Sequence, residues 1–260
     1  MNQFPDATEF VQFAHTLAAA SGIILREAAG RPPVVDVKSD ASYVTATDKA
    51  IETRLREMIE AAYPSHGILG EEFGPVNADA EFTWVLDPID GTAPFIAGIP
   101  VFGSLIGLAH HGRPFVGIID HPITEDRWSG VAGVMAEHNG VAVRTRACAG
   151  LSRALATCSS PDFMSPDELA RFTQLRHEVQ YVQYGGSCFS YGVLASGRTD
   201  LAVDAGLDAY DVIASIAVIE GAGGSVSDWD GSPIRLGWKG QIVAAGDYAC
   251  RLRALEVLAA

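Results

Sequence analysis

Two aspartates stand at the end of an apolar run in the stretch WVLDPIDGTAPF, residues 84–95. Pro88 lies between Asp87 and Asp90 and fixes one backbone φ angle, so we expect a rigid turn at this point. Such a turn would aim both carboxylates, and the backbone carbonyl of Ile89 between them, at one position. Carboxylates that converge at the mouth of a buried strand indicate a site for a cation.

Gly91 and Thr92 follow directly and begin a short helix that we predict to run through Phe95. Free N–H groups at the start of a helix bind phosphate oxygens, and a glycine lets the backbone approach closely. Metal ligands beside a phosphate-binding position indicate phosphoryl chemistry. A surface turn without chemical function is the better explanation of an isolated D-x-x-D-G pattern, but the longer string and the acids elsewhere in the chain favour a site.

Further acids occupy the ends of other predicted elements. Glu71 and Glu72 follow the predicted strand 67–70, and Asp48 and Asp211 each open a predicted helix. Carboxylates gathered in one cleft repel one another and lose hydration, at a cost of several kcal/mol per ion, unless cations neutralise them. Oxygen-only ligand sets favour hard ions such as Mg²⁺, which retains waters and commonly bridges to phosphate.

Apolar spacing predicts two helices and a mostly antiparallel sheet in the first half of the chain, then alternating strands and helices in the second. The first helices are predicted at 7–29 and 46–62, and Thr45 or Thr47 is expected to cap the second. The strands of the first half are predicted at 67–70, 82–87, 101–109, 114–120, 128–134 and 141–144. The second half is predicted to hold strands 154–158, 179–184, 201–203, 226–228 and 242–245, and helices 166–176, 187–196, 209–222 and 247–258.

The change of pattern places a boundary near residues 145–150. We predict an N-terminal α+β part, residues 1–148, that carries the metal site, and a C-terminal α/β part, residues 149–260, that completes the active site. No low-complexity linker separates them, so we expect the two parts to pack tightly.

Two glycine-containing motifs have simpler explanations than ligand binding. The GAGG run at 221–224 would suggest a nucleotide loop, but it ends a predicted helix instead of following a strand, so we expect a helix end. The DWDG run at 228–231 is similar to the start of a calcium loop, but the later ligands are missing and we expect a β-turn.

Composition narrows the class of protein. The 260 residues are 48% hydrophobic and 19% charged, which is typical of a globular protein. The formal net charge of −14 argues against a nucleic-acid or anionic-membrane partner. No apolar run approaches the roughly 20 residues that span a bilayer, and a signal pattern is lacking, so a cytoplasmic location is expected.

Cysteines and histidines give weak indications of a metal site. The four cysteines form no C-x-x-C pair, so reduced and mostly buried thiols are expected. His110 and His111 end an apolar run, and we expect a pair at a strand end, with zinc ligation as the minor alternative.

Four motifs in order resemble the inositol monophosphatase superfamily of Mg²⁺-dependent phosphatases, and the resemblance covers almost the whole chain. They are VTATD (44–48), GEE (70–72), WVLDPIDGT (84–92) and YDVIASIAVIEGAGG (210–224). Within the superfamily the chain is most similar to the histidinol-phosphatase branch, on stretches such as EDRWSG and YGGSCFSYGVLASGRTDLAVDAGLDAYD. The resemblance implies a layered α-β-α-β-α sandwich of the inositol monophosphatase and fructose-1,6-bisphosphatase type, and commonly a homodimer.

The resemblance also implies a ligand set. Glu71, Asp87 and the carbonyl of Ile89 would hold one Mg²⁺, and Asp87, Asp90 and Asp211 a second. A third, weaker ion would lean on Glu71. Two or three ions per subunit are therefore expected, with Mn²⁺ as an alternative metal.

Catalytic roles follow from the same resemblance. Asp48 and Thr92 would form a hydrogen-bonded pair beside the attacking water, and Glu71 would orient that water. The N–H groups of Gly91 and Thr92 would hold phosphate oxygens. Lys38 matches a lysine in the loop that precedes VTATD in the family. Hydrolysis by metal-activated water, without a covalent enzyme intermediate, is the expected reaction.

Departures from the branch pattern concern the substrate. Ser187 stands where the histidinol branch usually has aspartate, and Asp204 where it usually has glutamate. Both positions face the organic part of the substrate in relatives. The amine and imidazole of histidinol phosphate favour acidic groups, so these changes weaken that assignment. Ala93-Pro94 also replaces a common Lys/Arg-Ser pair.

The expected function is Mg²⁺-dependent hydrolysis of a small phosphate monoester, first of all histidinol phosphate to histidinol and phosphate, which would place the enzyme in histidine biosynthesis. The alternative within the same chemistry is an inositol or sugar phosphate. The alternative from another class is a non-catalytic metal- or phosphate-binding regulator. The complete acid set argues against the regulator.

Overall fold

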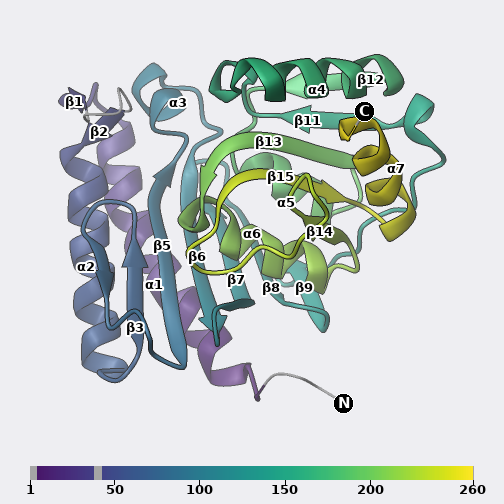
Figure 1. Cartoon of the computed structure of the whole chain (residues 1–260). Coiled ribbons are helices and arrows are strands. Elements are labelled where there is room, and N and C mark those ends of the chain that lie inside the picture. Colours follow the sequence, from purple (N-terminus) through teal and green to yellow (C-terminus); the bar gives the residue numbers. More distant parts are fainter. Residues whose placement is uncertain (1–4, 38–42, 260) are drawn as a thin grey trace.

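Residues 5–37 and 43–259 are described by the computed structural model of the chain. Together they form seven α-helices and fifteen β-strands (Figure 1). The helices are α1 (Thr8–Ala29), α2 (Ala46–Ala62), α3 (Thr92–Ala97), α4 (Pro166–Glu178), α5 (Phe189–Ala195), α6 (Ala209–Gly221) and α7 (Tyr248–Leu258).

The strands belong to three sheets. A small antiparallel pair joins β1 (Val35–Val37) and β2 (Tyr43–Thr45). The large sheet has the order β10-β9-β8-β7-β6-β5-β3-β4 and is antiparallel except where β3 meets β5. Its strands are β3 (Gly67–Gly70), β4 (Gly74–Val76), β5 (Phe82–Asp90), β6 (Gly103–His110), β7 (Arg113–His121), β8 (Asp126–Val131), β9 (Met135–His138) and β10 (Val141–Ala142).

The third sheet is mixed and has the order β12-β11-β13-β15-β14. Its first three strands are parallel, and the other two pair antiparallel. The strands are β11 (Leu155–Cys158), β12 (Tyr181–Tyr184), β13 (Leu201–Asp208), β14 (Ser225–Ser227) and β15 (Lys239–Ala245).

Helices and sheets alternate in five layers, which confirms the expected α-β-α-β-α sandwich. Helices α1 and α2 cover one face of the large sheet, α5 and α6 lie between the two large layers of strands, and α4 and α7 cover the outer side (Figure 1). Three apolar clusters fill the spaces between the layers, and the middle one contacts both sheets through the central helices. Each helix therefore buries an apolar face against a sheet, as layered domains require.

A row of glycines sets the distance between α6 and the large sheet. Gly107, Gly117 and Gly130 are register partners on three adjacent strands. A Cβ at Gly117 would overlap the carbonyl of Ala214, and one at Gly130 would lie 2.6 Å from the Cα of Val218. The missing side chains thus let the α6 backbone rest directly on the sheet, which brings the beginning of this helix close to the end of β5.

Most predicted elements are present, with differences at short strands. The strand predicted at 128–134 ends at Val131, and the one predicted at 141–144 covers only Val141–Ala142. The structure adds β9 between them, as well as β1, β2 and β4. These additional strands have four residues or fewer, too few to produce a clear alternation in the sequence.

The predicted division at residue 148 falls between the strands of the large sheet and those of the mixed sheet. Helix α6 belongs to the second part but packs on strands of the first, so the two parts share their central layer. The division itself stays a prediction. Within 5–37 and 43–259, none of the helices has both the length and the apolar character needed to cross a membrane.

Candidate active site

Asp87 and Asp90 lie at the end of β5, but they are not joined by the predicted turn. The strand continues through both residues, and its register with β6 shifts between them. Such a bulge inserts an extra residue, bends the strand and re-aims side chains, and it tolerates a proline. The carbonyl of Pro88 accepts a hydrogen bond from the Ser104 hydroxyl at 2.6 Å, which ties the bulge to β6. A bulge, and not a turn, therefore sets the directions of Asp87 and Asp90.

Asp211 and Asp48 are oriented by capping boxes at the beginnings of α6 and α2. One oxygen of Asp211 accepts the N–H of Asp208 at 2.6 Å. One oxygen of Asp48 accepts the N–H of Thr45 at 2.8 Å and its hydroxyl at 2.6 Å, so Thr45 is the cap of the predicted pair. A carboxylate near the N-terminus of a helix is stabilised by the helix dipole, and these bonds also fix its direction.

Three carboxylates meet where these elements converge. Each of Asp87, Asp90 and Asp211 offers an oxygen, and these oxygens all lie within 4.8 Å of one another. Asp87 is only 2% exposed, and its Oδ1 atom is buried without a hydrogen-bond partner. An unpartnered buried carboxylate oxygen is costly in the absence of a cation.

The electrostatics of this cluster also favour a cation. Burial raises the pKa of Asp87 well above its usual value, and the charges of Glu71, Asp90, Asp211 and Asp48 raise it further. Burial likewise raises the pKa of Asp211, with smaller contributions from Asp90 and Glu71. These carboxyls resist ionising together, and a bound cation would remove that resistance.

The donor set fits a hard divalent cation. All the converging donors are oxygens, and no nitrogen or sulfur belongs to this group among the described residues. Mg²⁺ prefers such ligands and Zn²⁺ or Cu²⁺ tend to prefer sites with imidazole or thiolate. The residues present therefore fit the metal expected from the sequence.

Glu71 is placed beside the cluster by a buried residue that the sequence analysis missed. Its charge raises the pKa of both Asp87 and Asp211, although it is not one of the three within 4.8 Å. Glu52 of α2 is fully buried and accepts the N–H groups of Glu72 at 2.8 Å and Phe73 at 3.2 Å. Glu52 therefore holds the segment that begins at Glu71. The sequence offers one indication of this role, because Glu52 is a charged residue directly after Ile51 on the helix face predicted to be buried.

The backbone after the bulge has the shape predicted for the phosphate position. Gly91 has a φ of 82°, the left-handed region that favours glycine, and Thr92 begins α3. The Thr92 hydroxyl donates to the carbonyl of Ile89 at 3.2 Å. A carbonyl oxygen has two lone pairs, so this bond leaves Ile89 able to bind a cation as well. The predicted Asp48–Thr92 pair stays a prediction.

Ser187 lies against Gly91 and has a left-handed backbone conformation with a φ of 44°. A Cβ at Gly91 would stand 2.9 Å from the Ser187 hydroxyl oxygen, so the two residues are in close proximity. The N–H of Cys188 donates to Asp90 at 2.6 Å. Residue 187 is thus held beside the acid cluster, and its contact with a substrate stays a prediction.

Asp204 is buried more deeply than its predicted role suggests. Only 3% of it is exposed, one oxygen accepts the N–H of Ser159 at 2.6 Å, and the other accepts the Tyr191 hydroxyl at 2.7 Å. Its charge contributes to the raised pKa of Asp90. The geometry favours a role in positioning these partners, and substrate contact by Asp204 stays a prediction. Lys38 lies outside the described residues.

His121 was not predicted from the sequence either, and it contacts Cys188, which in turn binds Asp90. It is fully buried, with Nδ1 2.8 Å from the carbonyl of Phe102 and Nε2 3.3 Å from the Cys188 sulfur. The carbonyl requires a proton on Nδ1, which leaves Nε2 unprotonated beside the thiol. The chain of contacts from His121 through Cys188 ends at Asp90.

The fold and the acid cluster define a phosphatase of the class that hydrolyses phosphoric monoesters. The model of the inositol monophosphatase family matches residues 6–259, and the chain therefore belongs to this family, whose members depend on a metal.

Similar proteins cover nearly all of the chain. The bifunctional phosphatase IMPL2, chloroplastic, of Arabidopsis thaliana is 40% identical over 96% of this chain and 76% of its own length. A histidinol-phosphatase of Chlorobaculum parvum is 32% identical over 86% of this chain and 87% of its own. The solved structure of an inositol monophosphatase from Zymomonas mobilis is 37% identical, has a TM-score of 0.90 and covers 99% of this chain and 100% of its own.

Proposed function

We propose that this phosphatase hydrolyses a small phosphate monoester with Mg²⁺ as its cofactor. The observation that carries the proposal is the convergence of Asp87, Asp90 and Asp211 from the end of β5 and the beginning of α6, with a buried and unpartnered oxygen on Asp87. The oxygen-only donor set supports Mg²⁺, with Mn²⁺ as the alternative.

The cluster has enough donors for more than one ion. One ion would be bound by Asp87, Asp90 and Asp211. A second would be bound by Glu71, Asp87 and the Ile89 carbonyl, and a third, weaker ion by Glu71. When bound, such ions supply charge that activates a water and stabilises the leaving oxygen. Their binding would also neutralise carboxyls whose pKa values burial raises.

The chain's own groups would position the reactants. Glu71 and Asp48 lie close enough for their charges to raise the pKa of Asp87, and we propose that with Thr92 they orient the attacking water. The N–H groups of Gly91 and Thr92, at the beginning of α3, would donate to phosphate oxygens. Because a water is the attacking group, the reaction would proceed without a covalent enzyme intermediate.

Histidinol phosphate is the substrate that we propose first. Its amine is cationic at neutral pH, and the net charge of −14 of the chain favours a cationic alcohol over a neutral one. The 32% identity with a histidinol-phosphatase supports the same choice. The reaction would then belong to histidine biosynthesis.

An inositol phosphate is the second candidate, and a specific observation favours it. Ser187 stands beside Gly91 where an aspartate would provide the countercharge for an amine. The solved inositol monophosphatase from Zymomonas mobilis is 37% identical. A neutral serine suits a neutral polyol better than an amine.

The test is release of inorganic phosphate from a panel of substrates, in MgCl₂ and in EDTA. Histidinol phosphate, inositol phosphates, sugar phosphates and 3′-nucleotide phosphates make up the panel. We expect turnover only with the metal and the highest kcat/KM with histidinol phosphate. No metal-dependent turnover of any member would reject the proposal and favour a non-catalytic regulator, whereas a preference for inositol phosphates would reject only the first substrate.

We also propose that the enzyme is a cytoplasmic homodimer. The oligomer follows from the family resemblance and the location from the sequence pattern. Light scattering coupled to size-exclusion chromatography would give the mass in solution, and a mass near that of one 27.5 kDa chain would reject the dimer.

A further inference from the structure

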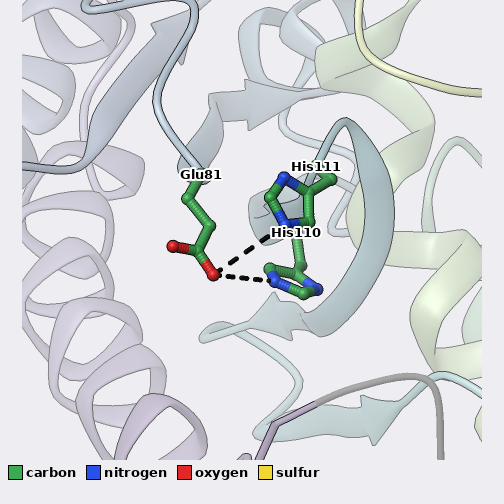
Figure 2. A group of neighbouring side chains, drawn as sticks. All are labelled: Glu81, His110 and His111. Atoms are coloured by element: carbon green, nitrogen blue, oxygen red, sulfur yellow. Dashed lines mark hydrogen bonds and ion pairs between the residues drawn. The ribbon is translucent and has the colours of Figure 1, made fainter.

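Three side chains with metal-binding atoms gather at the other end of β5, away from the acid cluster. Glu81 precedes β5, His110 ends β6, and His111 begins the turn to β7. One oxygen of Glu81 lies 3.1 Å from Nε2 of His110 and 3.9 Å from Nε2 of His111. Figure 2 shows both rings directed at this oxygen, and one donor atom from each residue lies within 4.8 Å of the other two.

The backbone brings these residues together independently of their side chains. The N–H of His111 donates to the carbonyl of Glu81 at 2.8 Å, and His110 is the register partner of Phe82. The His110 ring stacks on Phe82 with centroids 4.7 Å apart. Its side chain is 14% exposed, whereas those of Glu81 and His111 are 60% and 67% exposed. The group therefore combines one fixed imidazole with two donors that are free to adjust.

His111 occupies a left-handed backbone conformation, which is uncommon for residues other than glycine. Its φ is 48° and that of Gly112 is 73°, so both central residues of this two-residue turn are left-handed. Asn, Asp or Gly are the usual residues there, and histidine is also enriched among the few non-glycine residues with a positive φ, so asparagine fits this turn in its place.

We propose that Glu81, His110 and His111 bind a Zn²⁺ ion. Two imidazoles and one carboxylate are a common zinc ligand set, and a water would complete four ligands. Ligand distances of about 2.0–2.2 Å place neighbouring donors of a tetrahedral site roughly 3.3 Å apart. The separations of 3.1 and 3.9 Å are near this value, and the exposed His111 ring can close the difference.

This site is separate from the acid cluster in position and in chemistry. Nine residues of β5 lie between Glu81 and the end of the strand at Asp90, which at 3.3 Å per residue is roughly 25–30 Å. That distance exceeds the Debye length of about 8 Å at physiological salt. Nitrogen donors select zinc at one end of the strand, and oxygen donors select Mg²⁺ at the other.

Calorimetric titration of the full chain with ZnCl₂, in saturating MgCl₂, tests the site. The variant is His111→Asn, because asparagine accepts the left-handed backbone and removes the imidazole. His177→Asn, at an exposed position on α4, is the matched control. We expect one equivalent of zinc bound by the wild type and the control, and a Kd raised at least ~10-fold in His111→Asn. Turnover with Mg²⁺ should not change.

Two results would overturn the zinc site. Equal zinc binding by the wild type and His111→Asn would show that His111 is not a zinc ligand and that Glu81 and the two histidines form only an ion pair. Zinc binding lost in Asp90→Asn but kept in His111→Asn would place the ion at the acid cluster instead. Should His111→Asn fail to fold, Glu81→Gln removes the shared carboxylate oxygen charge and answers the same question.

Discussion

Acidification is expected to destabilise the protein through His121. Burial lowers the pKa of this imidazole from 6.5 to about 4. A group with a lowered native pKa binds fewer protons when folded, so the stability it contributes is present above pH 6.5 and is lost as the pH falls toward 4. The protonated ring would have to break its contact with the Cys188 thiol or remain charged in a buried position.

The size of the effect follows from the shift. A difference of 1 pKa unit corresponds to about 1.4 kcal/mol, so the loss is about 3 kcal/mol when complete and about 2 kcal/mol at pH 5. For a chain of this size, 2 kcal/mol lowers Tm by roughly 4–8 °C. The acids of the cluster act in the opposite direction, because burial raises their pKa values and the native state then binds more protons.

Urea unfolding followed by tryptophan fluorescence, in EDTA at pH 7.5 and pH 5, measures this loss. His121→Gln keeps a polar side chain of similar size but does not titrate, and it retains the cluster acids. We expect the free energy of unfolding to fall by about 2 kcal/mol more in the wild type than in the variant. His177→Gln should behave as the wild type. The same pH dependence in wild type and His121→Gln would refute the buried neutral imidazole.

Three further predictions concern residues around the cluster: Ser187, Glu52 and Gly117. Ser187→Asp should raise kcat/KM for histidinol phosphate but not for inositol phosphates; an unchanged ratio removes residue 187 from specificity. Glu52→Gln leaves the buried Arg56 without its carboxylate partner, so urea unfolding should show a loss of about 3–5 kcal/mol, and a loss under 1 kcal/mol would contradict this. Gly117→Ala forces α6 off the sheet, so we expect about 3 kcal/mol lower stability and weaker Mg²⁺ binding by calorimetry, and wild-type values for both would refute the close approach.

Local signals predicted most of the fold. Helices α1 and α2 follow from apolar spacing, and the cap at Thr45 follows from a short side chain before a helix. The acids of the site were found in the same way, since Asp48 and Asp211 stand at helix beginnings and Asp87 ends an apolar strand. Such features depend only on residues that are close in sequence, so they can be predicted from one sequence.

The remainder depends on pairing between distant segments. The bulge at Asp87–Asp90 exists because β6 fixes the register, and the glycine row under α6 appears only when three strands are aligned. Similarly, Cys188 supports Asp90 across 98 positions of sequence. No local pattern specifies these contacts, although each decides where a carboxylate points.

Phosphate release by the wild type and Asp90→Asn, measured side by side across a range of Mg²⁺ concentrations, tests the central claim most directly. The variant removes one of the three converging carboxylates, relieves the repulsion among them and keeps an oxygen for the Cys188 N–H. We predict Mg²⁺-dependent turnover for the wild type and none for the variant, with Tm unchanged or higher in EDTA. A variant that retains wild-type kcat would contradict the assignment of these acids to the metal.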